Sequence, residues 1–123
     1  HSFPTRRSSD LSRLEDLFAF AAQLQKRHGL QLACFGHAGD GNIHTNVMVD
    51  FQQPGAKARS EAALDELFCQ VLAWGGSITG EHGIGIAKKR WWSVAVSKEV
   101  HSLHRTVKHA LDPKGILNPG KFV

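Results

Sequence analysis

The sequence predicts an α+β fold, in which a mainly antiparallel sheet carries helices packed on one face. Three observations indicate this class. Apolar residues recur at helical spacing in three segments, an Asp-Gly pair lies between two strand-like segments, and the predicted order is helix, strand, strand, helix, strand, helix. That order favours a layer of helices on a sheet of hairpin-connected strands.

The first predicted helix begins at Ser12, which forms a capping box with Glu15, and ends at Gly29. Its apolar stripe comprises Leu14, Leu17, Phe18, Ala21, Ala22 and Leu24. Residues 1–11 cluster Ser, Arg and Pro without any period, so we expect a disordered or non-native leader there. The credible domain therefore runs over residues 12–123.

A hairpin is predicted next, with strands at residues 30–35 and 43–49. Asp-Gly between strand-forming residues is a strong hairpin signal. If Asp40 and Gly41 form a two-residue loop, His37 directly faces His44. Opposed residues on an antiparallel pair have Cβ atoms about 5 Å apart. The spacing then brings two imidazoles side by side.

The rest of the chain alternates helical and extended segments. A second helix is expected at residues 56–74, with Leu64, Leu67, Phe68, Val71 and Leu72 buried, and a short strand at residues 77–79. A helical turn is expected at residues 88–92. The last helix starts near Ser97 with Val100, Leu103, Val107 and Leu111 inward, and Asp112-Pro113 ends it before an extended tail.

Composition limits the protein class. The chain has 123 residues, a net charge of +4 and 41% hydrophobic residues, which suits one modest domain or part of a larger chain. The charge permits an anionic small substrate without demanding nucleic acid. Two cysteines make a disulfide framework improbable and favour a reducing, cytoplasmic location. We expect neither a membrane span nor a secretory signal.

A divalent metal site is the first candidate for chemistry. His37 and His44 offer two neutral nitrogen ligands, and a catalytic site needs a third protein ligand and an open position. Glu81 is the best third ligand, because it lies in a glycine-rich turn, GEHGIG, after the short predicted strand. A lone histidine is more often a hydrogen-bonded polar residue; the predicted pairing of the two favours a metal.

Three further residues lie close to the proposed ligands in the sequence. His82 follows Glu81 and could act as a general base, or simply bond to the backbone of its turn. Asn46 shares a strand face with His44 and could donate to a substrate carboxylate, or merely finish the strand. Asp40 is expected to serve the turn itself.

Other motifs point less clearly to chemistry. GEHGIG does not fit the GxGxxG pattern, and Glu81 would repel a phosphate. The basic and aromatic residues 88–92 fit a nucleic-acid surface less well than a solvated helix face with one packed tryptophan. His101 and His104 lie three positions apart on a helix and could share a metal, but surface histidines are the better interpretation.

Three linked motifs carry a family resemblance. GHAGDGNIHTN, GSITGEHGIG and LDPKGILNPGK, in this order, resemble the C-terminal domain of FAD-linked oxidases, a group that includes D-lactate dehydrogenases, the glycolate oxidase flavin subunit and D-2-hydroxyglutarate dehydrogenase. The resemblance covers residues 12–123. It implies an FAD-dependent oxidation of a 2-hydroxy acid to a 2-oxo acid, with hydride transfer to the flavin.

The resemblance also implies roles for individual residues. His37, His44 and Glu81 match the family's divalent-metal ligands, expected to hold zinc or manganese. Asn46 matches a substrate-binding asparagine and His82 the catalytic histidine. In the tail, Asn118 and Lys121 match the segment that runs back towards the flavin.

The expected partners follow from the resemblance. They are a small 2-hydroxy acid, the flavin-binding domain that precedes this one in the family, and an iron–sulfur or other electron-accepting subunit. Most FAD contacts would come from the flavin domain, so we expect the chain alone to be an inactive fragment. The alternative is a stand-alone metal- or ligand-binding module of the same fold, without redox activity.

Overall fold

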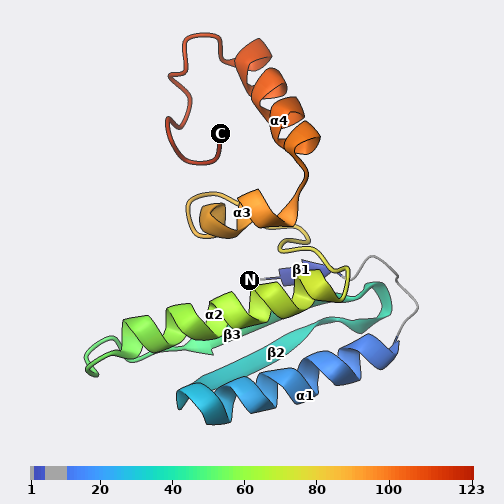
Figure 1. Ribbon diagram of the computed structural model, residues 1–123, viewed down its shortest axis with the longest axis vertical. Helices are drawn as coiled ribbons and strands as arrows, with labels where there is room; N and C mark the ends of the chain where they lie inside the picture. The colour runs from blue at the N-terminus through green and yellow to red at the C-terminus, as the bar shows by residue number, and fades with distance from the viewer. Residues whose placement is uncertain (1, 5–10) are drawn as a thin grey trace. The chain divides into compact units, whose positions relative to one another are not determined.

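A computed structural model describes residues 2–4 and 11–123 of the chain. These residues divide into two compact units, one ending at His82 and one from Gly83 to Val123. The first unit contains β1 (Ser2–Pro4), α1 (Leu11–His28), β2 (Gln31–His37), a short 3₁₀ helix (Ala38–Asp40), β3 (Asn42–Met48) and α2 (Ala56–Ala73) (Figure 1). The second contains α3 (Lys89–Ala95) and α4 (Lys98–Leu111).

The sheet of the first unit has the strand order β1-β3-β2, and both pairings are antiparallel. Its outer strand β1 lies in the stretch that was expected to be a disordered or non-native leader. The backbone of Ser2–Pro4 pairs with β3 at residues 42–44. Leu11 already belongs to α1, so Ser12 lies inside the helix and not at its cap. Residue 1 and residues 5–10 of the predicted leader lie outside the described residues.

Helices cover one face of this sheet, as the predicted α+β class requires. Ile43 and Thr45 of β3 are buried, whereas Asn46 and Met48 on the opposite face are exposed. This alternation is typical of a sheet with one covered and one open face. Figure 1 shows α1 and α2 lying along the β2–β3 hairpin on the covered side. The fold-class prediction is confirmed for this unit.

The hairpin turn is longer than predicted, and the register changes with it. Phe35 lies opposite His44, and His37 lies opposite Asn42, so the predicted direct pairing of His37 with His44 is wrong. The 3₁₀ helix and Gly41, which is left-handed at φ 70°, make a four-residue connection. Asp40 Oδ1 accepts a hydrogen bond from the Asn42 amide at 3.2 Å, which confirms its predicted role in the turn.

Gly36 is required by the close approach of the two strands. A Cβ at this position would lie 2.2 Å from the Asn42 carbonyl oxygen, and its φ of 148° is one that L side chains rarely adopt. We expect Gly36→Ala to lower the free energy of unfolding by about 1–3 kcal/mol, because the clash is with backbone. Urea denaturation measures this. Gly39→Ala is the matched control, since a Cβ added there would have nothing within 4 Å. Equal losses of unfolding free energy in the two variants would contradict the requirement for glycine at position 36.

The core of the first unit lies between α1, α2 and the covered face of the sheet. Its fully or nearly fully buried apolar residues include Leu14, Leu17, Ala21, Leu24, Ile43, Ala63, Leu67, Phe68, Val71 and Ile78. Phe18 and Ala22, predicted to be inward, are exposed because they lie outside the narrow stripe that α1 presents to α2. At the C-terminal end of α1, Arg27 and His28 both pair with Glu66 of α2.

The loop that follows α2 positions the later site residues. Residues 77–79 form no strand, so that prediction is wrong; the residue before them, Gly76, makes an isolated bridge. The loop is held instead by the Gly76 amide, which donates to the Val71 carbonyl at 2.9 Å, and by Ile78, which is 2% exposed. Anchoring Ile78 in the core fixes the chain only three residues before Glu81.

The second unit is built around Trp92 of α3. Its ring makes edge-to-face contacts with His101 and His104 of α4 and with Phe122 of the tail, at centroid distances of 4.9 to 5.3 Å. The two histidines are therefore half-buried, not surface residues as predicted. The face of α4 that carries His101 and His104 is the one turned towards Trp92. The predicted inward residues Leu103, Val107 and Leu111 are consequently exposed, and only Val100 is half-buried.

The tail folds back on α4, whereas an extended segment was predicted. The Asp112 carboxylate accepts hydrogen bonds from the Ile116 and Leu117 amides, and Lys108 Nζ donates both to Asp112 and to the Leu117 carbonyl. The Lys108 contact holds the pKa of Asp112 below its usual range, helped by the two amides. These contacts close the chain around the end of α4.

Candidate metal and substrate site

Three side chains of the first unit converge on one point above the open face of the sheet. His44, Glu81 and His82 each offer a ligand atom, and these atoms all lie within 4.8 Å of one another. His44 Nε2 lies 3.2 Å from Glu81 Oε1, and His82 Nε2 lies 3.5 Å from the same oxygen. The His44 and His82 rings meet edge to face at 5.3 Å. Residues separated by 37 positions in the chain therefore form one cluster.

The accessibility of the cluster suits a site that takes a ligand from solvent. The side chain of His44 is 18% exposed, while those of Glu81 and His82 are 51% and 64% exposed. Two imidazole nitrogens and one carboxylate oxygen are a donor set that zinc and other divalent transition metals accept. The residues present therefore fit a divalent metal, with room for water or substrate oxygens.

The structure brings His44, Glu81 and His82 together but leaves His37 outside that trio. His37 is the last residue of β2 and is exposed. Because it faces Asn42, it lies diagonally across from His44 on the same face of the sheet. Diagonal neighbours are about 7–8 Å apart, still within reach of long side chains. His37 is thus a neighbour of the cluster and is not one of the three residues whose ligand atoms lie together.

Sequence reasoning missed Phe35 at this site. It lies directly opposite His44, and the two rings are stacked, with centroids 5.2 Å apart and an interplanar angle of 24°. The signal that could have found Phe35 is the turn length, since a four-residue connection pairs it with His44.

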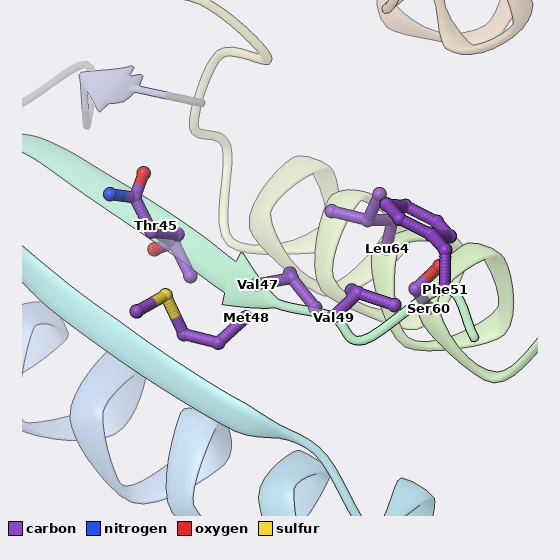
Figure 2. A pocket seen from close by; sticks show the side chains of 8 residues that line it. Thr45, Val47, Met48, Val49, Phe51, Ser60 and Leu64 are labelled. Atoms are coloured by element: carbon purple, nitrogen blue, oxygen red, sulfur yellow. The ribbon is translucent and has the colours of Figure 1, made fainter. Parts of the chain in front are cut away.

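Asn46 lies two residues beyond His44 on the open face, opposite Ala33. It is exposed and lines a hollow of about 420 Å³ between the end of β3 and α2. Figure 2 shows Val47, Val49 and Leu64 around this hollow, which is mainly apolar. Its lining does not include His44, Glu81 or His82, so the hollow is separate from the cluster.

The residues predicted to contact the flavin lie in the second unit. Asn118 and Lys121 are both exposed, and Asn118 has a left-handed backbone with φ 48°. In the same unit, Lys89 and Arg90 are exposed, as a solvated basic face requires, but Lys88 is buried and two tryptophans, Trp91 and Trp92, are packed where one was expected. Burial lowers the pKa of Lys88. Buried indoles cannot serve as stacking platforms for nucleic-acid bases.

Comparison with known proteins gives the family. Residues 7–122 match the family described as FAD linked oxidases, C-terminal domain. The chain belongs to this family. It is 38% identical over 96 residues to the glycolate oxidase subunit GlcD of Bacillus subtilis. The aligned region makes up 78% of this chain and 20% of the relative.

Two other relatives carry different names. The D-2-hydroxyglutarate dehydrogenase of Xanthomonas citri pv. viticola is 46% identical over 95 residues, 72% of this chain and 19% of the relative. The mitochondrial D-lactate dehydrogenase [cytochrome] of Kluyveromyces lactis is 32% identical over 112 residues, 91% of this chain and 19% of the relative. The chain thus spans about a fifth of the length of these FAD-linked relatives.

The α-helices in the described part of the family domain give no sign of a membrane span. None of them combines the length and the apolar composition needed to cross a bilayer.

Proposed function

We propose that this chain is the substrate- and metal-binding half of a flavin-dependent 2-hydroxy-acid dehydrogenase of the D-lactate or glycolate class. The observation that carries the proposal is the convergence of His44, Glu81 and His82 on one point. The names of the FAD-linked relatives support the reaction class. The 2-hydroxy acid, the flavin domain and an electron-accepting subunit are the proposed partners.

The proposed metal ligands are His44, Glu81 and His37, with zinc or manganese as the ion. His44 and Glu81 already face one another, and His37 lies on the same open face of the sheet. His82 is the most exposed of the clustered side chains and is proposed as the base, because a fourth protein ligand would close the position that substrate needs. The competing arrangement makes His82 the third ligand.

Each residue then has a distinct task. His82 Nε2 takes the proton of the substrate hydroxyl and later releases it to water. Asn46, two residues from His44 on the open face, donates its side-chain amide to the substrate carboxylate. A bound metal would supply Lewis-acid chemistry to the substrate oxygens, and FAD, which would be held mainly by the flavin domain with a contribution from Asn118 and Lys121, would supply the hydride acceptor.

The metal claim is tested on the chain itself. We expect the wild type to bind one equivalent of Zn²⁺ or Mn²⁺ in a calorimetric titration. His44→Ala should weaken binding by more than the roughly 10–100-fold that loss of an outer-shell partner costs, because a direct ligand is removed. The matched control is His109→Ala, an exposed histidine of the second unit.

The same titration separates the two ligand arrangements. Under the proposal, His37→Ala weakens binding and His82→Ala leaves it nearly unchanged. The reverse pattern would make His82 the ligand. Equal metal content in the wild type and in His44→Ala would contradict the proposal that His44 belongs to a metal site.

A further inference from the structure

The ring of Phe35 has no role in the chemistry described above, yet it lies against a proposed metal ligand. Phe35 is 53% exposed, so it contributes little to the core. Its position is nevertheless closely fixed. The register of β2 and β3 places it directly opposite His44, and Gly36, where a side chain would clash with the Asn42 carbonyl, holds the backbone beside it.

We propose that Phe35 is a positioning residue, which holds the His44 imidazole with Nε2 directed at Glu81 and so strengthens metal binding. This inference rests on the proposed metal site. Phe35 acts through His44 and need not touch the ion or the substrate itself.

The geometry of His44 supports this role. Tilting the imidazole out of its present plane would break two contacts together, the stack on Phe35 at 5.2 Å and the approach of Nε2 to Glu81 Oε1 at 3.2 Å. The stack fixes the plane of the ring, and the Glu81 contact in that plane fixes which edge faces the carboxylate. A ligand that is already oriented loses less conformational freedom when the metal binds.

The electrostatics of the stack point in the same direction. The face of a phenyl ring carries partial negative charge, and it is attracted to a neighbouring group that is positively polarised. An imidazole becomes positively polarised when its nitrogen binds a cation. The stack therefore favours the metal-bound form of His44 over the free form, which an aliphatic side chain of similar size would not do.

The chain offers a matched set of variants. Phe35→Leu keeps apolar volume and removes the ring, whereas Phe35→Tyr keeps the ring. Phe51→Leu is the control, because Phe51 is 72% exposed and, among the described residues, shows no ring contact with a histidine. Thermal unfolding of each variant checks that the fold is intact.

The first measurement is the Zn²⁺ dissociation constant, obtained by competition with a chelator. Phe35→Leu should bind about 2–10-fold more weakly, the usual range for loss of one aromatic pair, with an unfolding midpoint close to that of the wild type. Phe35→Tyr should restore wild-type affinity and Phe51→Leu should not change it. Unchanged affinity in Phe35→Leu, or equally weak binding in Phe35→Tyr, would overturn the proposal.

The second measurement uses metal-free protein, so that failure of the metal site and failure of this inference can be told apart. In NMR spectra, the His44 ring protons should show an upfield ring-current shift that is lost in Phe35→Leu and kept in Phe35→Tyr. If the wild type binds no metal, the proposed function fails, and the role of Phe35 in affinity fails with it. If metal binds but the His44 shift is the same in all variants, only the role of Phe35 is overturned.

Discussion

Replacing His82 with alanine is expected to lower turnover of a 2-hydroxy acid by about 10²–10⁴-fold, the usual contribution of a general base. The assay needs a polypeptide that carries this domain together with the flavin domain. The physical reason is position, since His82 is exposed to solvent and its Nε2 lies beside the carboxylate of Glu81, where a substrate hydroxyl would be held.

The control for this experiment is the metal content of the same variant. If His82 is the base, metal stays bound while the maximal rate falls, because the lost interaction belongs to the transition state. Normal turnover in His82→Ala would show that His82 is not the general base. Loss of metal along with activity would instead make it a ligand, in agreement with its place in the cluster.

Replacing Phe68 with alanine is expected to have the largest effect on stability. Phe68 is completely buried in the middle of α2, so its removal leaves a cavity as well as losing buried apolar area. The expected loss is about 3–5 kcal/mol in the free energy of unfolding, measured by urea denaturation.

Phe18→Ala is the matched control for this substitution. The helical periodicity predicts that both phenylalanines point inward, but Phe18 is 46% exposed. Its loss should cost less than about 1 kcal/mol, as for other substitutions away from the core. A similar loss in both variants would contradict the burial pattern of α1.

The periodicity of apolar residues predicted the helices well, because it follows directly from which face each helix buries. The segments at α1, α2 and α4 all match, and Ser97 caps α4 by accepting a hydrogen bond from the Val100 amide. Burial on α4 could not be predicted in the same way. An apolar stripe shows which face avoids water, but not whether another element is present to cover it.

The hairpin shows how the residues that share one face of a sheet can be predicted when the register of the strands is not. The pairing was displaced by two residues, because Asp40-Gly41 fits a two-residue loop as well as the end of a longer turn. An even displacement keeps every side chain on its own face of the sheet. His37, His44 and Asn46 therefore still share the open face, although His37 no longer faces His44.

The approach of Glu81 to His44 was predicted for a partly wrong reason. A strand at residues 77–79 was expected to carry it into the sheet, but a loop anchored by Ile78 brings it there instead. Local propensity gives little information about such a loop, because its path is set by burial of one side chain in a core formed elsewhere. Phe35 was missed because its role depends on the register.

The central claim is that a divalent metal is held between the hairpin and the GEHGIG turn. Anomalous diffraction from a crystal of this chain grown with Zn²⁺ tests it most directly. We expect one strong peak about 2.0–2.2 Å from both His44 Nε2 and a Glu81 carboxylate oxygen. A zinc ion bound only at other residues, or no peak beside His44 at saturating zinc, would contradict it.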